Sequence, residues 1–258
     1  MLNNLIKRII TGIILVLLVF GMTLTNRFYL LIGLLVFSNI AIYEMSNALS
    51  KIHYAPNKYL AYSINTLILC LGYLIDLQFI VPIMSIYIVL LLMILIFSKE
   101  GSMHSLFGNA FLLIYLTVPY YFLLTIKDIK WALYVFGIAS STDTMAYFVG
   151  ITMGKHKLIE RLSPKKTVEG SMGGILGGLI FTYVFVSIFK IEHSGLIYLF
   201  SIMASILSQV GDLVASFIKR KANIKDYGVI FIGHGGVMDR FDSILLITPI
   251  VYLLVLII

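Results

Sequence analysis

Charged residues are scarce in this sequence, and their scarcity argues against a soluble fold. Asp, Glu, Lys and Arg make up 12% of the 258 residues, whereas 60% are hydrophobic. A soluble domain of this length cannot hide so much apolar surface, because its area shrinks too slowly relative to its volume. The apolar runs are about 20 residues long, enough for a helix to cross a hydrocarbon core of roughly 30 Å. We therefore predict an all-α polytopic membrane protein.

Cysteine is nearly absent, since Cys70 is the only one, and a disulfide within the chain is therefore excluded. A nucleic-acid-binding module is also lacking, so the net charge of +7 does not indicate an RNA or DNA partner. Lys7 and Arg8 lead into an apolar run without a cleavage signal. We expect that first helix to serve as its own insertion signal.

Hydropathy along the chain predicts about nine transmembrane helices. Their expected ranges are roughly 9–25, 28–48, 59–76, 79–97, 105–126, 130–151, 170–189, 194–214 and 241–258. Polar residues are concentrated after residue 140. We therefore expect residues 1–128 to form structural and dimerisation helices. Residues 129–258 should form the working region, with polar loops at 152–169 and 215–240.

The basic residues are distributed unevenly between the two sides of the predicted bundle. When the loops are assigned alternately to the two sides, 15 of the 19 Lys and Arg residues fall on the side of the N-terminus. The other four are Arg27, Lys127, Lys130 and Lys190. Cytoplasmic loops carry the excess of Lys and Arg in membrane proteins. We therefore predict a cytoplasmic N-terminus, an outside C-terminus and both large polar loops in the cytoplasm.

Four aspartates stand within or beside the predicted transmembrane helices, namely Asp143, Asp212, Asp239 and Asp242. A charge at the centre of a lipid-embedded helix costs roughly 2.5–3.5 kcal/mol on insertion scales, so such residues tend to mark function. A single aspartate can simply cap a helix or pair with Lys or Arg. Four carboxylates without adjacent cations instead indicate a metal, and oxygen ligands of this type suit Mg²⁺.

The first polar loop contains the run SPKKTVEG, in which Lys165 and Lys166 follow Ser163-Pro164. Proline fixes the backbone, the lysines supply positive charge, and the next helix, expected to begin at Gly170, adds amide donors at its N-terminus. This combination predicts a cradle for phosphate groups. The alternative is a positive-inside anchor that touches anionic lipid, which is the reading we favour for Lys155 and Lys157. The glycine pairs at 173–174 and 177–178 indicate close helix packing.

The second polar loop joins basic residues to a glycine-rich turn. Residues 216–221 have basic and apolar faces and are expected to form a short interfacial helix. Lys219, Arg220 and Lys225 can neutralise lipid headgroups or phosphates. Glycines at 233, 235 and 236 permit tight turns and close approach of the backbone to a ligand. His234, placed among them, either donates to a phosphate oxygen or holds the loop.

The run SFIKRKANIKDYGVIFIGHGGVMDRFD resembles the diagnostic segment of the phosphatidate cytidylyltransferases, also called CDP-diacylglycerol synthases. STDTMAYFVG, SPKKTVEG and QVGD resemble the same family, so the similarity covers roughly the C-terminal half. Two positions depart from the family pattern, because Ile232 stands where proline is usual and Met145 where a small residue is usual. The residues that match the diagnostic pattern are Ser216, Lys219-Arg220, Lys225-Asp226, His234-Gly235-Gly236 and Asp239-Arg240-Phe241-Asp242.

The resemblance implies that CTP reacts with phosphatidate to give CDP-diacylglycerol and pyrophosphate. It also implies Mg²⁺, K⁺ as a second cation, and a homodimer in the lipid of the cell (inner) membrane with its active site facing the cytoplasm. By motif, Asp212 and Asp239 hold the metal with Asp143 and Asp242 as supporting acids. For the reaction itself we expect Lys166 and Lys219 to act with them by neutralising phosphate charge. The residues expected to bind substrate are Ser163, Lys165, Lys166, Gln209, Lys219, Arg220, Lys225, His234, Gly235 and Gly236.

Three other classes of protein were weighed against this interpretation. A CTP-dependent lipid kinase or an archaeal-type CDP-lipid synthase shares the nucleotide and the membrane but differs in its acceptor. A CDP-alcohol phosphotransferase requires an Asp-Gly pair, and the sequence contains none. A transporter with intramembrane carboxylates predicts acids near the bilayer midplane and inverted repeats, whereas these acids are expected near the cytoplasmic side and no repeat is evident. Arg240 has an open role, either catalytic or paired with Asp226 or another acid.

Overall fold

The structure of the chain is a computed structural model, and it describes residues 21, 26–74, 80–98, 101–231 and 235–258. The described residues form two compact units. Unit 1 contains the chain up to Lys127 together with Lys221–Arg240, and unit 2 contains Asp128–Arg220 together with Phe241–Ile258. The predicted helix at 9–25, Ile232, Gly233 and His234 lie outside the described residues, except for Gly21, which is helical.

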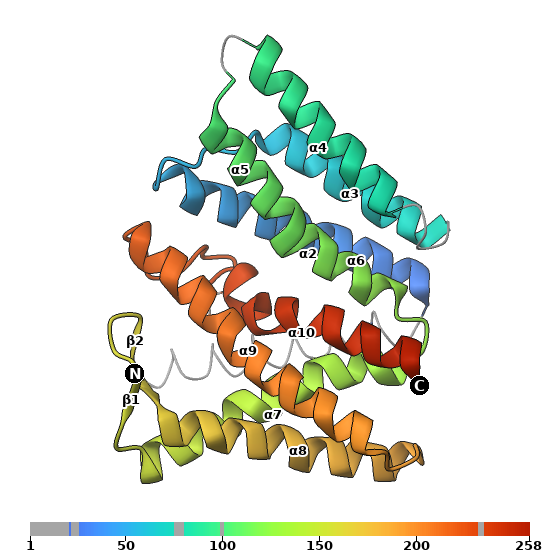
Figure 1. Cartoon of the computed structure of the whole chain (residues 1–258), viewed down its shortest axis with the longest axis vertical. Coiled ribbons are helices and arrows are strands. Elements are labelled where there is room, and N and C mark those ends of the chain that lie inside the picture. The colour runs from blue at the N-terminus through green and yellow to red at the C-terminus, as the bar shows by residue number, and fades with distance from the viewer. Residues whose placement is uncertain (1–20, 22–25, 75–79, 99–100, 232–234) are drawn as a thin grey trace. The chain divides into compact units, whose positions relative to one another are not determined.

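Unit 1 is built from helices joined by short connections (Figure 1). They are α2 (Arg27–Ser50), α3 (Lys58–Leu74), α4 (Ile80–Phe97), α5 (Met103–Leu112), the π-helix η2 (Leu113–Thr117) and α6 (Val118–Thr125). Asn26 caps α2, because its side chain accepts a hydrogen bond from the Phe28 amide. The π-helix directly precedes the turn that contains Pro119. Since proline has no N–H to donate, a local widening of the helix is expected there.

Unit 2 consists of three long helices, a hairpin and most of a fourth helix. Its elements are α7 (Ile129–Met153), β1 (Lys157–Ile159), β2 (Ser163–Thr167), α8 (Val168–Phe189), α9 (Gly195–Lys221) and α10 (Met238–Ile257), whose first turn belongs to unit 1. A buried chain of hydroxyl groups joins α7, α8 and α9. The Tyr134 hydroxyl lies 2.7 Å from Thr182 Oγ1, which donates to Ser201 Oγ at 2.7 Å. These contacts satisfy polar groups that lipid cannot satisfy.

The glycine pairs of α8 allow close helix packing, as the sequence predicts. A Cβ added to Gly174 would lie 3.0 Å from the Thr142 carbonyl oxygen of α7 and 3.2 Å from Gln209 Nε2 of α9. Gly177 lies directly against the Met145 side chain. The large residue at position 145 is therefore accommodated by the absence of a side chain on the facing helix.

The prediction of a mainly helical membrane protein is confirmed in its coarse form. Within the described part of the chain, six segments are long and apolar enough to cross a membrane, and they lie where six of the nine spans were predicted. They are Arg27–Ser50, Ile80–Phe97, Met103–Thr125, Val168–Phe189, Gly195–Lys221 and Met238–Ile257. Of these, α4 is the most apolar and the least buried. A helix that is both highly apolar and highly exposed is expected in lipid, because lipid tails are as apolar as its side chains.

The boundaries of the two polar loops differ from the prediction. Residues 215–221 continue α9 without a break, so the separate interfacial helix expected at 216–221 is wrong. The helix continues because Ala215 and Ile218 extend its buried face and no Gly or Pro interrupts it. At the other end, α10 begins at Met238, which places Asp239 and Arg240 in its first turn.

The first polar loop contains an antiparallel β-hairpin, which the sequence analysis did not predict. Lys157 pairs with Thr167 and Ile159 with Ser163. The Thr167 side chain then accepts a hydrogen bond from the Gly170 amide at 3.1 Å, so α8 begins at Val168 rather than at Gly170. The hairpin is therefore joined directly to the first turn of α8.

Candidate functional site

Three of the four predicted aspartates lie together in unit 2. Asp143 of α7, Asp212 of α9 and Asp242 of α10 are close enough to influence one another electrostatically. Ser243 stands between two of them, since its hydroxyl lies 3.4 Å from both Asp143 Oδ2 and Asp242 Oδ1. Its backbone amide also donates to Asp242 Oδ1 at 2.7 Å. Three helices thus contribute one carboxylate each to a single acidic group.

Two lysines lie beside these carboxylates. Lys166 of β2 forms an ion pair with Asp212, and Lys219 of α9 is within electrostatic range of Asp242. Asp212 and Lys219 are seven residues apart, which places them two turns apart on one face of α9. Cations therefore lie beside the carboxylates in space although their immediate sequence neighbours are mainly neutral. The cations come from a hairpin and from a helix extension, neither of which the sequence analysis predicted.

Gly211 brings the backbone of α10 against α9 beside Asp212. A Cβ added to Gly211 would overlap the Asp242 carbonyl oxygen and would lie 3.3 Å from the Ser243 Cα atom. Only a residue without a side chain allows this approach. Gly211 therefore sets how near the Asp212 and Asp242 carboxylates can lie, a role that the sequence analysis did not assign.

Hydrogen bonds to the backbone fix the hairpin that carries Lys165 and Lys166. The Lys157 ammonium donates to the Pro164 carbonyl oxygen at 2.6 Å. Glu169 accepts from the backbone amides of residues 155 and 156, and its Oε1 lies 2.6 Å from His156 Nδ1. Successive residues of a strand face opposite sides, so Lys166 reaches Asp212 while Lys165 is exposed.

Other predicted substrate-binding residues lie near this group or on its margins. Gln209 is buried and its amide nitrogen donates to the Ser171 carbonyl oxygen at 3.2 Å and the Ser205 carbonyl oxygen at 3.3 Å. It therefore holds α8 against α9, and its contact with substrate stays a prediction. Ser163 is half-buried in β2, and Arg220 is exposed near the end of α9. Lys225 is exposed in unit 1.

The fourth aspartate, Asp239, belongs to unit 1 and has a different environment. Its Oδ2 accepts hydrogen bonds from the Tyr227 amide at 2.8 Å and the Gly236 amide at 2.9 Å. Gly235 adopts a φ of 84°, a conformation that favours glycine, and its carbonyl oxygen accepts from the Phe231 amide at 2.9 Å. Asp239 thus lies at the base of the glycine loop, of which residues 227–231 and 235–238 are described. The position of Asp239 relative to the other three acids stays a prediction.

A fifth intramembrane acid, Glu44, also contacts this segment. It lies in α2, is 2% exposed, and accepts hydrogen bonds from the amides of Val237 and Met238. Glu44 is not among the site residues predicted above, although a charged residue inside a predicted transmembrane helix is a signal of function in its own right. Glu44 does not belong to any of the family motifs, because these all lie in the C-terminal half.

The arrangement in unit 2 has the donor type that Mg²⁺ takes. Within the described residues no three His, Cys, Asp or Glu side chains stand in a metal-ligating cluster. Mg²⁺ does not require such a cage, because it is usually held by one or two carboxylates together with substrate phosphates and water. Asp212 and Asp242 are carboxylates of this kind, and Lys166 and Lys219 place positive charge beside them. The group is chemically suited to bind a polyphosphate with a divalent cation.

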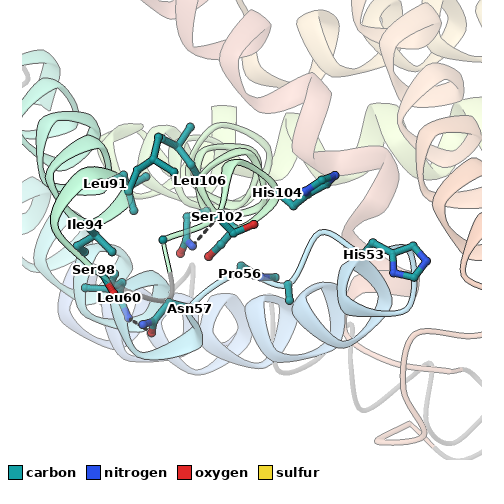
Figure 2. Close-up of a pocket in the computed structure, with 15 residues that line it drawn as sticks. His53, Pro56, Asn57, Leu60, Leu91, Ile94, Ser98, Ser102, His104 and Leu106 are labelled. Carbon is teal, nitrogen blue, oxygen red and sulfur yellow. Dashed lines mark hydrogen bonds between the residues drawn. The ribbon is translucent and has the colours of Figure 1, made fainter.

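A pocket of about 370 Å³ lies elsewhere in unit 1, at the connections between α2 and α3 and between α4 and α5 (Figure 2). Among the described residues, its lining mixes apolar side chains with polar ones and includes no Asp, Glu, Lys or Arg; His53, Asn57, Ser102 and His104 are among the polar members. It contains none of the residues predicted to bind substrate. The His104 ring packs against Tyr54, with the ring centroids 5.3 Å apart, which favours a structural role for this histidine.

Comparisons with known proteins agree with the resemblance seen in the sequence. Residues 6–258 match the model of the cytidylyltransferase family. Proteins named phosphatidate cytidylyltransferase are similar to the chain, including one from Bacillus subtilis that is 37% identical over 147 residues, or 55% of each chain. One from Staphylococcus haemolyticus is 42% identical over 140 residues, or 53% of each chain. One from Aquifex aeolicus is 37% identical over 159 residues, or 60% of each.

The chain spans about half the length of the curated relatives it matches. The family model, in contrast, matches nearly all residues of this chain. The motif residues of that resemblance, Asp212, Asp242 and Lys219, are those that meet in unit 2. Lys166 lies beside them, paired with Asp212. The chain belongs to the cytidylyltransferase family.

Proposed function

We propose that this chain transfers CMP from CTP to phosphatidate, giving CDP-diacylglycerol and pyrophosphate. The observation that carries the proposal is the acidic group of unit 2 with a lysine beside each of two aspartates. Carboxylates that hold a cation and ammonium groups that meet phosphate are what the joining of two polyanions requires. The relatives named phosphatidate cytidylyltransferase supply the identity of the two substrates.

The reaction is a displacement at phosphorus. A phosphate oxygen of phosphatidate forms a bond to the α-phosphorus of CTP, and the bond from that phosphorus to the oxygen bridging to the β-phosphorus breaks. The electron pair of the broken bond leaves with pyrophosphate. The nucleophile is already ionised, so the site needs no strong general base. Its work is to hold both substrates in line and to neutralise their charge.

Lys166 and Lys219 are assigned to the phosphates in this proposal. Lys166 pairs with Asp212. A triphosphate competes with Asp212 for the Lys166 ammonium, because phosphate oxygens are strong charged acceptors. Ser163, Lys165, Gln209, Arg220, Lys225, His234, Gly235 and Gly236 are the further residues proposed to contact CTP or phosphatidate.

Asp212 and Asp239 are proposed as the principal carboxylates for Mg²⁺, with Asp143 and Asp242 supporting them. When bound, Mg²⁺ supplies positive charge to the nucleotide phosphates and the leaving pyrophosphate. K⁺ is proposed as a second cation. The proximity of Asp212 and Asp242 supports a cation there, since like charges held close together are stabilised by a counter-ion.

The membrane arrangement proposed for this activity has nine transmembrane helices, a cytoplasmic N-terminus and an outside C-terminus. The site then opens to the cytoplasm of the inner membrane, where CTP arrives from water and phosphatidate from the adjacent leaflet. The excess of Lys and Arg on that side supports the orientation. A homodimer formed by the helices of residues 1–128 completes the proposal.

Purified chain in detergent tests this function when it is supplied with labelled CTP and Mg²⁺. Turnover to CDP-diacylglycerol is expected with phosphatidate and not without it. A second reaction replaces phosphatidate by a polyprenol. Consumption of CTP with the polyprenol alone would assign the chain to CTP-dependent lipid kinases instead. A CDP-lipid formed from an archaeal-type ether lipid but not from phosphatidate would identify a different acceptor.

A further inference from the structure

Glu44 binds the beginning of α10 across a separation of more than 190 residues in the sequence. Its Oε1 accepts from the Val237 amide at 3.2 Å and its Oε2 from the Met238 amide at 2.8 Å, and these donors stand 193 and 194 residues away. The first amides of a helix have no acceptor within the helix. Glu44 of α2 therefore acts as the cap of α10, a role that a neighbouring residue usually fills.

Two glycines on opposite sides of the loop make room for the Glu44 carboxylate. A Cβ added to Gly228 would overlap Glu44 Oε1, and a Cβ added to Gly236 would overlap the same carboxylate. A Cβ on Gly228 would also lie 3.2 Å from the Gly236 Cα atom. The two ends of the loop and the carboxylate are therefore in mutual contact. Side chains at positions 228 and 236 would push the carboxylate away from its two amides.

Asp239 holds the same loop from within. Its Oδ2 accepts from the Tyr227 and Gly236 amides, next to the two glycines that contact Glu44. Glu44 and Asp239 together bind four backbone amides of the segment 227–238. Carboxylates that accept backbone N–H groups form stronger hydrogen bonds than neutral acceptors do. The described residues of the glycine loop, 227–231 and 235–238, are therefore held by two acids, one of them on α2.

We infer that Glu44 is a positioning residue of the nucleotide site, which fixes the first turn of α10 and the glycine loop so that Gly235, Gly236 and Asp239 are in place for the reaction. The inference rests on the proposed function. Glu44 acts through the loop and does not touch the reacting atoms. Its importance follows from its chemistry, since both of its oxygens receive a donor and it is almost fully buried.

Glu44→Gln is the sharpest test because it keeps the shape and removes one acceptor. The glutamine NH₂ group would face a backbone N–H, and buried donors that lose their acceptor are costly. We expect kcat to fall about 100-fold with KM for CTP changed less than about threefold, because small misplacement of reacting groups lowers the rate by that order. Glu192→Gln makes the same chemical change at an exposed position and should leave both constants unchanged.

A second control separates positioning from a general loss of stability. Asn65 is buried in unit 1, where its Nδ2 donates to Ser38 Oγ at 2.7 Å. Asn65→Leu removes that hydrogen bond within the same unit, far in the sequence from the loop. It should lower the midpoint of thermal unfolding without lowering kcat. An equal fall in kcat for Asn65→Leu and Glu44→Gln, at an equal shift of the thermal midpoint, would contradict this expectation. That result would show that Glu44 contributes only to stability and does not position the loop.

Hydrogen exchange tests the inference without any activity. The amides of Val237 and Met238 should exchange at least about tenfold faster in Glu44→Gln, because an opened hydrogen bond of ~1.4 kcal/mol corresponds to that factor. Peptides from α7 and α8 should exchange as in the parent chain. Unchanged exchange at positions 237 and 238 would overturn the inference.

Gly228→Ala provides the same test if Glu44→Gln does not fold, since its methyl group displaces the same carboxylate. In the double variant, Gly228→Ala should increase the exchange rate of the Val237 and Met238 amides little beyond the effect of Glu44→Gln. The reason is that both substitutions disrupt the same contact between Glu44 and these amides. Full additivity of the two changes would contradict the inference. A parent chain that shows no turnover with CTP and phosphatidate would refute the proposed function, while the exchange experiment would still decide whether Glu44 holds the loop.

Discussion

The two units stabilise their carboxylates in different ways. In unit 2, Asp212 pairs with Lys166, and Asp242 lies within electrostatic range of Lys219. In unit 1, Glu44 and Asp239 accept hydrogen bonds from backbone amides. An ammonium group on a long side chain can exchange its carboxylate for a phosphate, whereas a backbone amide remains fixed in its helix or loop. We therefore interpret the acids of unit 2 as groups that respond to substrate.

The acids of unit 1 instead determine the shape of the glycine loop. A buried carboxylate that binds two amides fixes the backbone around it, because leaving either amide without an acceptor is unfavourable. Asp239 is the exception within this division, since it holds the loop and is also proposed to bind the metal. Substitutions that remove a charge but keep the side-chain shape separate the two kinds of carboxylate, and the effects below are given from the largest to the smallest.

Asp239→Asn should cause the largest loss, because it affects both the proposed metal ligation and the loop. We expect turnover to fall by at least about 10³-fold, the order found when a group that stabilises transition-state charge is removed. Exchange of the Tyr227 and Gly236 amides should also become faster, as measured by mass spectrometry. Near-normal turnover in a well-expressed variant would remove Asp239 from the metal site.

Asp212→Asn should reduce turnover by a similar factor, about 10³-fold, without loosening any loop. The thermal midpoint should stay the same or rise, because removing one of three neighbouring negative charges offsets the loss of the partly exposed ion pair with Lys166. Turnover and thermal unfolding measured on the same preparation check both expectations. A large thermal destabilisation would show that Asp212 has the fixed role assigned to the acids of unit 1, and the contrast between the units would fail.

Lys166→Ala should lower kcat/KM for CTP by about 100-fold, since a single donor to developing phosphate charge is lost. Lys155→Ala is the matched control, because Lys155 is an exposed lysine just before the same hairpin. It should change kcat/KM by less than about threefold, as expected for a charge whose attraction is screened by water. Equal effects of the two substitutions would return Lys166 to the class of positive-inside anchors.

Gly211→Ala should have the smallest effect. Its methyl group meets the Asp242 carbonyl oxygen, so α10 must shift away from α9, and overpacking of this kind costs about 1–3 kcal/mol of stability. Gly195→Ala is the control on the same helix, since nothing lies within 4 Å of a Cβ at that position. Thermal unfolding should separate the two variants. Equal midpoints would show that the close approach at Gly211 does not constrain the carboxylates.

Much of the helical structure could be predicted from the sequence because lipid leaves few alternatives. A chain in hydrocarbon must satisfy its own backbone groups, so apolar runs of span length become helices. The hairpin at 157–167 has no comparable signal, and the chain just before it is held by a contact that no local pattern shows, since Glu169 of α8 accepts from the amides of residues 155 and 156. The continuation of α9 to Lys221 follows from an apolar face that extends beyond the predicted span.

The site could be predicted only where its residues form a local motif. Asp212, Asp242 and Lys219 belong to segments that resemble a family, and the structure brings them together. The contacts of Ser243 and Gly211 depend on how helices cross, which a single sequence does not encode locally. Glu44 lies 193 residues from its hydrogen-bond partner Val237, so its role emerges only from the folded chain.

The central claim is that this chain transfers the cytidylyl group of CTP to phosphatidate, and the position of a label tests it most directly. Parallel reactions with phosphatidate receive CTP labelled at the α-phosphorus or at the γ-phosphorus. The account predicts that the α-label enters the lipid product and the γ-label is released in pyrophosphate, in equal amounts. Transfer of the γ-label to lipid, with the α-label left in CDP, would contradict it.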